Sequence, residues 1–573
     1  MKQQTRTLRL LVALLGTLAL VATACGPTGP TSGGTTAAPG ETPVAGGRLI
    51  EGSFADIKTL NPMLVADVPS STVTGKIYDT LFFADPKNGE LKPNLGKWTI
   101  SSDSLTYNWE IDPKANWSDG KPVTGEDYLT GLKLVAMSKL TVRKSNFQDI
   151  EGWKDFVDGK ATTISGVKVD SADPKKFSVK FAKVFCPALV NAFGSSSGPM
   201  PTHIFGKYTA AGQADAIDKA PENTAPTVSS GPYVFKEWRK GDQVILTKNQ
   251  NYFKGSPLID EYVFKIVADA TVLAAQLKTG ELNYGTVEPK DLADMEAQQN
   301  LKVFKYQALS YTYIGWNVKS TTAPALQDKR VRQALAYGLD MDAVVKSILF
   351  GQGTKMVAHH PPASWAAPGA GLNQYPYDKA KAEDLLKTAG YTKGGDGIYA
   401  KDGKPIEFSI VANSGNKTRE TLLQVATEQY KAIGVKVNPK LEAFETMVDK
   451  LTTGNQEIQG WIIGWSLGLE PDPYGIWHST QIPNPAAKTT GFNFGAFTNA
   501  DFDKAIEAGR SGNCSQAERK KNYETFNKIL NEEQPYMFGF SPNTLLVVPQ
   551  NLRAIDPGTF SATWNLEKWW FKQ

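Results

Sequence analysis

Apolar residues follow two different spacings between Tyr311 and Asp342, and the change of spacing predicts a strand followed by a helix. Residues 311–316 read YTYIGW, a run of aromatic and β-branched residues typical of a buried strand. After a polar loop, Asp328 stands where a helix N-cap belongs. The apolar face of that helix would hold Val331, Leu335 and Leu339, and its water-facing side Lys329, Arg330 and Arg332.

Strand and helix patterns alternate again further along the chain. Residues 403–411 and 458–463 have strand patterns, and residues 418–432 between them have the pattern of a helix. This βαβ order predicts an α/β protein with a mostly parallel sheet, whose ligand crevice lies beyond the carboxyl ends of the strands. The rule points to residues 413–416 and to the loop of residues 464–474.

The length of 573 residues is too great for one hydrophobic core, so several lobes are expected. We expect a first lobe over residues 48–310, with an inserted subdomain at about 84–225, and a second lobe over residues 311–534. Pro535 interrupts the preceding helical pattern, and the strand pattern from Pro535 to Val548 predicts a return of residues 535–573 to the first lobe.

The N-terminus has the pattern of a secretory signal. Residues 10–22 form an apolar run that is too short to span a membrane, and basic residues precede it. Cys25 follows small residues, as in a bacterial lipobox, so residues 1–25 are expected to be a lipoprotein signal peptide with Cys25 lipidated. Cleavage near Ala24 with an incidental Cys25 is the alternative. Residues 26–47, rich in Gly, Pro and Thr, are expected to be a flexible linker.

The formal charge limits the class of partner, and the number of cysteines limits the possible disulfides. Loss of the three basic residues before the apolar run takes the formal charge from +4 to +1, which argues against nucleic acid as a partner. Cys186 and Cys514 then remain besides Cys25. A disulfide between two different lobes would hinder a hinge, so two unpaired thiols are expected.

Four phrases of the sequence together resemble one family. They are WSDGKPVTGED (residues 117–127), SGPYVF (230–235), DKRVRQALAYGLD (328–340) and GWSLGLEPDPY (464–474). The chain resembles the family 5 extracellular solute-binding proteins, the peptide-binding subunits of ABC importers, from about residue 48 to residue 540. In the first phrase, Asp119-Gly120 predicts a turn and Thr124 a helix cap, which is a structural role.

The resemblance implies a periplasmic-binding-protein type II-like fold, with two large lobes joined by a hinge. It implies a monomeric, membrane-anchored receptor outside the cytoplasm that captures oligopeptides between the lobes and delivers them to permease subunits. No G-x-x-x-x-G-K-[ST] loop is present, so the ATPase would be a separate subunit. The ligand contacts expected are Phe54, Ala55, Asn413, Ser414, Gly415, Asn416, Trp465, Ser466, Leu467, Gly468 and Asp472.

The loop after Trp465 lacks one feature of the family. Peptide binders of the family carry an Asp there that pairs with the ligand's α-ammonium, and the matching position is Gly468. Glu470 and Asp472 are the nearest substitutes, although Asp472 in an Asp-Pro-Tyr sequence is equally typical of a turn. A weak dependence on a free N-terminus is therefore expected.

Other functions find less support in the sequence. Residues 194–198 read GSSSG, but Pro199 follows, which favours a turn over a nucleophile elbow. His359-His360 precedes two prolines without other metal ligands at suitable spacing, so a solvated loop is expected there, and no metal or cofactor. The sequence therefore offers no set of catalytic residues that would support a hydrolase function. An oligosaccharide stacked on tryptophan remains the alternative ligand.

Overall fold

The computed structural model describes residues 41–194, 198–210, 213, 215–455 and 457–573. The expected signal peptide, Cys25, most of the linker and the centre of the GSSSG sequence lie outside these residues. Within them, no helix has both the length and the apolar character needed to cross a membrane.

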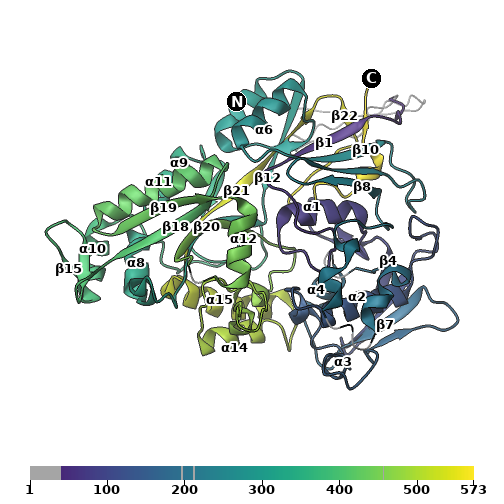
Figure 1. Cartoon of the computed structure of the whole chain (residues 1–573), viewed down its shortest axis with the longest axis horizontal. Coiled ribbons are helices and arrows are strands. Elements are labelled where there is room, and N and C mark those ends of the chain that lie inside the picture. Colours follow the sequence, from purple (N-terminus) through teal and green to yellow (C-terminus); the bar gives the residue numbers. More distant parts are fainter. Residues whose placement is uncertain (1–40, 195–197, 211–212, 214, 456) are drawn as a thin grey trace, which may run out of the picture. The chain divides into compact units, whose positions relative to one another are not determined.

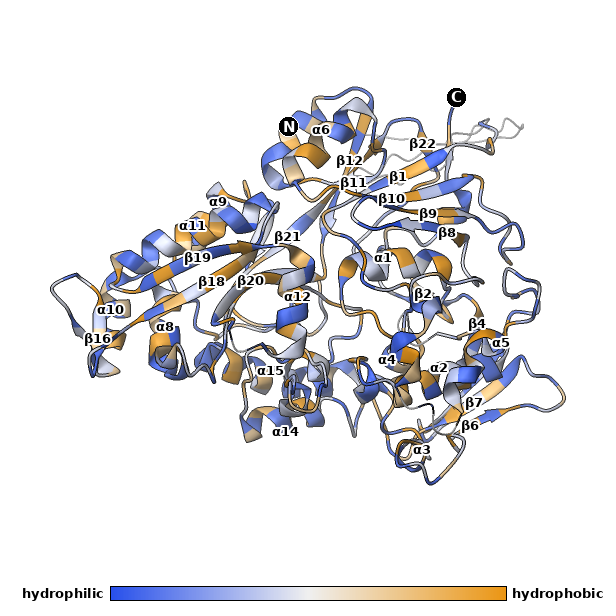
Figure 2. Cartoon of the chain, viewed as in Figure 1, coloured by the Kyte–Doolittle hydropathy of each residue, from blue (hydrophilic) through white to orange (hydrophobic). Residues whose placement is uncertain are grey.

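The buried apolar residues form two large cores. Figure 2 shows hydrophobic residues along the strands and helices that contribute to both. The first core draws on residues between Leu49 and Tyr284 and between Leu546 and Trp569. The second core draws only on residues between Tyr311 and Phe540. A small third cluster joins α6 (Ala270–Thr279) and α7 (Leu292–Glu296) to the chain near Val547.

The second core is built on part of an eight-stranded sheet with the order β11-β21-β13-β20-β18-β19, in which β12 and β14 also pair with β21. β18 is parallel to both β19 and β20, but β13 is antiparallel to β20 and β21. The expectation of a mostly parallel sheet therefore holds only for β18–β20. The strands are β11 (Gly285–Thr286), β12 (Leu301–Gln307), β13 (Ser310–Trp316), β14 (Gly353–Lys355), β18 (Glu407–Asn413), β19 (Lys436–Glu442), β20 (Gly460–Ser466) and β21 (Tyr536–Pro549).

Helices surround this sheet, with α9 and α11 on one side of it and α8 and α10 on the other in the view of Figure 1. Asp328 caps α8 by accepting from the Arg330 N–H at 2.9 Å, as the sequence predicts. Arg332, expected in water, is buried and donates to the backbone carbonyls of Leu326, Gln327 and Glu533. The helices are α8 (Lys329–Tyr337), α9 (Met341–Ser347), α10 (Lys379–Thr388), α11 (Lys417–Ala432), α12 (Phe444–Thr453), α13 (Tyr474–Trp477), α14 (Ala500–Ala508) and α15 (Gln516–Glu533); a three-stranded sheet adds β15 (Thr392–Lys393), β16 (Tyr399–Lys401) and β17 (Lys404–Pro405).

Two four-stranded sheets, β1-β10-β9-β8 and β4-β5-β7-β6, contribute to the first core. Thr124 caps α2 in a capping box with Asp127, and buried Asp127 also accepts from the Trp117 indole at 3.1 Å. Residues 117–127 therefore have the structural role predicted for them. The elements are β1 (Arg48–Ser53), α1 (Val68–Ile77), β2 (Phe82–Ala84), β3 (Leu91–Pro93), β4 (Gly96–Ile100), β5 (Thr106–Ile111), α2 (Gly125–Met137), α3 (Trp153–Val157), β6 (Val167–Val169), β7 (Lys176–Lys180), α4 (Ala188–Phe193), α5 (Thr202–Phe205), β8 (Tyr233–Arg239), β9 (Gln243–Lys248), β10 (Glu261–Ile266), β22 (Leu552–Arg553) and β23 (Trp570–Phe571).

The chain passes between the two cores at β12–β13 and again along β21. The first part of β21 pairs with β13 and β14, and its second part pairs with β11 and β12. β21 corresponds to the strand pattern from Pro535 to Val548 in the sequence, while the return of residues 535–573 to the first lobe stays a prediction. In Figure 1, β21 runs diagonally from the sheet of the second core towards β12.

Cys186 and Cys514 form a disulfide, so the expectation of two unpaired thiols is wrong. The expectation assumed that cysteines in different lobes stay apart. The loop before α4 and the loop before α15 instead meet, and the two Cα atoms are 5.1 Å apart, a normal separation for a disulfide.

Candidate functional site

Arg419, in the first turn of α11, places its guanidinium between the carboxyl ends of β18 and β20. Its Nη1 donates to Asn413 Oδ1 at 2.7 Å, at the end of β18. Its Nη2 lies 2.9 Å from the position that a Cβ would occupy on Gly464, near the end of β20. The missing side chain of Gly464 therefore makes room for the guanidinium.

The guanidinium of Arg419 forms no direct ion pair among the described residues, although the nearby Glu288 carboxylate, which accepts from the Thr418 N–H at 3.2 Å, acts to raise its pKa. The Arg419 Nε is enclosed without an acceptor in the described part of the chain. Burial lowers the pKa of this side chain to about 10, which still leaves it charged at neutral pH. A cation at a helix N-terminus also opposes the helix dipole. The arrangement is suited to receive an anion.

The loop after β18 packs closely on the N-terminus of α6. Gly415 accepts from the Ala270 N–H at 3.1 Å, and Lys417 pairs with Asp269 at 2.9 Å. Gly415 has a φ of +88°, and a Cβ built on it would lie 2.0 Å from the carbonyl oxygen of Ala268. Only glycine permits both this backbone conformation and this approach.

The end of β1 contacts α12 in a similar way. The ring of Phe54, which is 38% exposed, packs edge-on against Phe444 with 5.0 Å between the centroids. The Asp56 N–H donates to Glu445 Oε1 at 2.8 Å, while Ala55 is buried. These contacts again join segments that belong to different cores.

Trp465 is half-buried at the end of β20, within an aromatic group. It stacks on Phe494 at 5.2 Å and on Tyr313 at 6.4 Å between ring centroids. Among the residues that follow, Ser466 and Gly468 are exposed, while Leu467 packs on the second core. Gly468 has nothing within 4 Å of a built Cβ, so an additional side chain would find open space there.

The two carboxylates proposed as substitutes for an amine anchor are already paired. Asp472 Oδ2 accepts from Arg510 Nε at 3.0 Å and from Asn191 Nδ2 at 3.1 Å. Its Oδ1 accepts from the Tyr474 N–H at 3.1 Å, a hydrogen bond typical of an Asp side chain in a turn. Glu470 forms a buried ion pair with Arg519.

His359 and His360 are buried, so the expectation of a solvated loop is wrong. The Tyr311 hydroxyl lies 2.8 Å from His359 Nδ1, and the Trp477 indole N–H donates to the same nitrogen at 3.1 Å. His360 Nε2 lies 2.8 Å from the carbonyl oxygen of Pro471, a hydrogen bond that holds the loop after β20. Aromatic neighbours enclose both rings, which the sequence could not indicate.

The structure brings only part of the predicted site together. Arg419 links Asn413 to Gly464, beside Trp465. Phe54 instead packs against α12, and Asp472 lies in a separate ion pair. Ser414 is exposed, and Asn416 caps α11 by accepting from the Arg419 N–H. The expected ligand contacts therefore remain a prediction. Sequence reasoning missed Arg419, whose signal was a basic residue in the first turn of a predicted helix.

The part of the chain that the structure describes holds no group of three or more His, Cys, Asp or Glu side chains arranged so that they could ligate a metal ion.

Comparison with known proteins gives consistent matches. Residues 90–485 match the family described as "Bacterial extracellular solute-binding proteins, family 5 Middle". The oligopeptide-binding protein AppA of Bacillus subtilis is 30% identical over 575 residues, which cover 99% of both chains. The structure of AppA in complex with a nonapeptide has a TM-score of 0.83 and covers 93% of this chain and 100% of that one. NikZ of Campylobacter jejuni in complex with Ni(L-His) has a TM-score of 0.79 at 25% identity, with coverages of 92% and 99%.

Proposed function

The chain belongs to family 5 of the bacterial extracellular solute-binding proteins, and from that premise we propose that it captures oligopeptides between its two lobes for an ABC importer. Its fold is of the periplasmic-binding-protein type II-like class, and its role is binding rather than catalysis. The exact lobe boundaries, at residues 310 and 534, are part of the proposal. Ligand would stabilise the closed arrangement through contacts that the open one lacks.

One observation carries the choice of a peptide: the guanidinium of Arg419 at the carboxyl ends of β18 and β20, whose Nε has no hydrogen-bond acceptor and which forms no direct ion pair among the described residues. A peptide brings a terminal carboxylate, whereas a neutral oligosaccharide brings no anion. A carboxylate on a largely buried arginine forms a strong charge-assisted hydrogen bond. The relative AppA, whose solved structure holds a nonapeptide, supports the same ligand class.

Calorimetry with a peptide and its C-terminal amide tests this proposal. The wild type should lose at least ten-fold in affinity on amidation, and Arg419→Gln should bind both forms with the same reduced affinity. Arg419→Lys, which keeps the charge, should retain part of the preference for the acid. Equal affinities of wild type for the acid and the amide would contradict the role of Arg419.

The finer parts of the proposal concern anchoring and delivery. We propose that Cys25 carries the lipid, so that the receptor is held at the outer face of the cytoplasmic membrane and delivers peptides, as a monomer, to permease subunits with a separate ATPase. Glu41 pairs with Arg553 at 2.9 Å and with Lys572 at 2.6 Å, so the tether would leave the folded body beside its C-terminus. Radiolabelled palmitate should enter the wild type but not Cys25→Ala, and equal labelling would exclude Cys25 as the acylated residue.

A further inference from the structure

The disulfide joins loops that belong to the two cores. Cys186 lies between β7 and α4, whose buried residues belong to the first core, and Cys514 lies between α14 and α15 of the second. The two cysteines are 328 residues apart in the sequence. Apart from this bond, the chain itself connects the cores only at β12–β13 and along β21. In Figure 1, α4, α14 and α15 lie lower in the view than β12, away from the place where the chain crosses between the cores.

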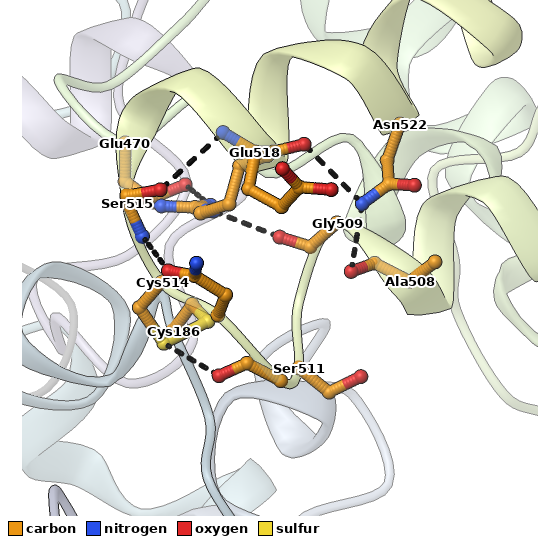
Figure 3. The surroundings of a disulfide bond; sticks show 12 residues. Cys186, Glu470, Ala508, Gly509, Ser511, Cys514, Ser515, Glu518 and Asn522 are labelled. Carbon is orange, nitrogen blue, oxygen red and sulfur yellow. Dashed lines mark hydrogen bonds and ion pairs between the residues drawn. A yellow bond between two sulfur atoms is a disulfide. The ribbon is translucent and has the colours of Figure 1, made fainter.

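The loop that carries Cys514 makes local hydrogen bonds next to the disulfide (Figure 3). Ser515 caps α15, and the Asn513 side chain accepts from the Ser515 N–H at 3.0 Å. On the other side, the Cys186 N–H donates to the Arg510 carbonyl at 2.8 Å. The cysteine at position 514 is exposed and the one at 186 is half-buried, so a small reductant can reach the bond.

Arg510 connects the disulfide to the loop after β20. Its Nη2 donates to the Ser145 carbonyl at 2.9 Å, and its guanidinium carbon lies 4.8 Å from the Phe185 ring, both in the first core's part of the chain. The same guanidinium pairs with Asp472 and lies 3.8 Å from the Tyr474 ring. Movement of one core away from the other at this edge would therefore disturb the proposed ligand loop.

We infer that the Cys186–Cys514 disulfide is a covalent clasp across the binding cleft, which limits how far the lobes open and slows ligand exchange. A disulfide holds its Cα atoms within about 7 Å of each other, so the two loops that it joins cannot separate while it is intact. Exchange in the oxidised protein must then use a restricted opening. This inference rests on the proposed function only where it concerns ligand exchange.

The test compares the oxidised wild type, the same protein treated with dithiothreitol, and the Cys186→Ser/Cys514→Ser variant. Dithiothreitol transfers two electrons and two protons to the sulfurs, which become thiols, and it becomes a cyclic disulfide. Small-angle scattering of the ligand-free proteins gives the radius of gyration. A pool of random-sequence nonapeptides, followed by mass spectrometry after dilution into an isotope-labelled pool, gives the exchange rate.

Both the reduced wild type and the double variant should have a larger ligand-free radius and at least ten-fold faster peptide exchange than the oxidised protein. Dithiothreitol should change neither property in the double variant. If that variant fails to fold, reduction of the purified wild type still tests the inference. An unchanged radius and exchange rate after complete reduction would overturn the clasp. A radius that increases while no peptide binds would support the clasp and contradict the proposed function.

Discussion

Asp472 and Arg510 form an ion pair of 3.0 Å whose side chains are only 3% and 7% exposed. The pair occupies the carboxylate that would otherwise be the best substitute for an amine anchor. Because Glu470 is also paired, with Arg519, the loop after β20 has no free anion near Gly468 among the residues described. Peptide binding should therefore depend weakly on a free N-terminus.

N-terminal acetylation of a peptide should change its affinity less than ten-fold in the wild type. Gly468→Asp should strengthen binding of the free-amine form relative to the acetylated form, because the open space at Gly468 accepts a carboxylate. Gly468→Asn is the matched control without charge. In calorimetry, a loss of two decades on acetylation that disappears in Asp472→Asn would show that Asp472 is an amine anchor after all.

Breaking the Asp472–Arg510 pair should destabilise the fold. Asp472→Ala leaves the Arg510 guanidinium buried without its carboxylate, and removal of one partner of a buried pair costs about 3–5 kcal/mol. Lys504→Ala, which removes an exposed pair with Asp501, should cost less than about 0.5 kcal/mol. Denaturant unfolding measures both values. Equal losses in the free energy of unfolding for the two substitutions would show that the buried ion pair stabilises the fold no more than the exposed one.

Stability should fall in mild acid because of His359 and His360. Burial lowers the pKa of His360 to about 4 and that of His359 well below its usual value. A histidine whose folded pKa is depressed contributes stability that is present above the unfolded pKa, about 6.5, and is lost as the pH falls towards the folded pKa. The loss for His360 is about 3 kcal/mol between pH 6.5 and 4. Urea unfolding measures the free energy of unfolding at each pH in this range. In His360→Gln this free energy should fall less steeply with decreasing pH than in the wild type, and an equal pH dependence would argue against His360 as the cause.

Gly415→Ala should disrupt the contact between the loop after β18 and α6. The added Cβ would overlap the Ala268 carbonyl, and the residue would have to keep a φ of +88°. We expect a loss of about 1–3 kcal/mol in stability, as for other strained or overpacked positions. Gly468→Ala, which meets nothing within 4 Å, should have little effect. Thermal unfolding of both variants would reveal whether the contact matters, and similar curves would show that it does not.

Local patterns predicted local structure well. Asp328 and Thr124 cap the helices expected of them, since a cap depends on residues within one turn. The strand β21 was also predictable, because Pro535 ends the helix before it. Features that depend on distant neighbours were not predictable.

Arg332, His359 and Cys186 illustrate that limit. The carbonyls that accept from Arg332 include that of Glu533, 201 residues away in the sequence. Trp477, which packs against His359, is 118 residues away from it. Cys186 meets its partner only because two loops of different cores converge. For the candidate site, Asn413 and Trp465 lie at the carboxyl ends of β18 and β20, as the strand patterns predict, but their role in ligand binding stays a prediction. The position of the Arg419 guanidinium between these strands becomes evident only once its surroundings are known.

Peptide binding between the two lobes is the function proposed for this protein. Calorimetric titration of the ligand-free protein with a pool of nonapeptides, and separately with pools of cello- and xylo-oligosaccharides, tests it most directly. We expect peptide binding with micromolar or tighter dissociation constants, about −8 kcal/mol or better, and no heat from the sugars. Binding of an oligosaccharide pool without binding of peptides would contradict this proposal.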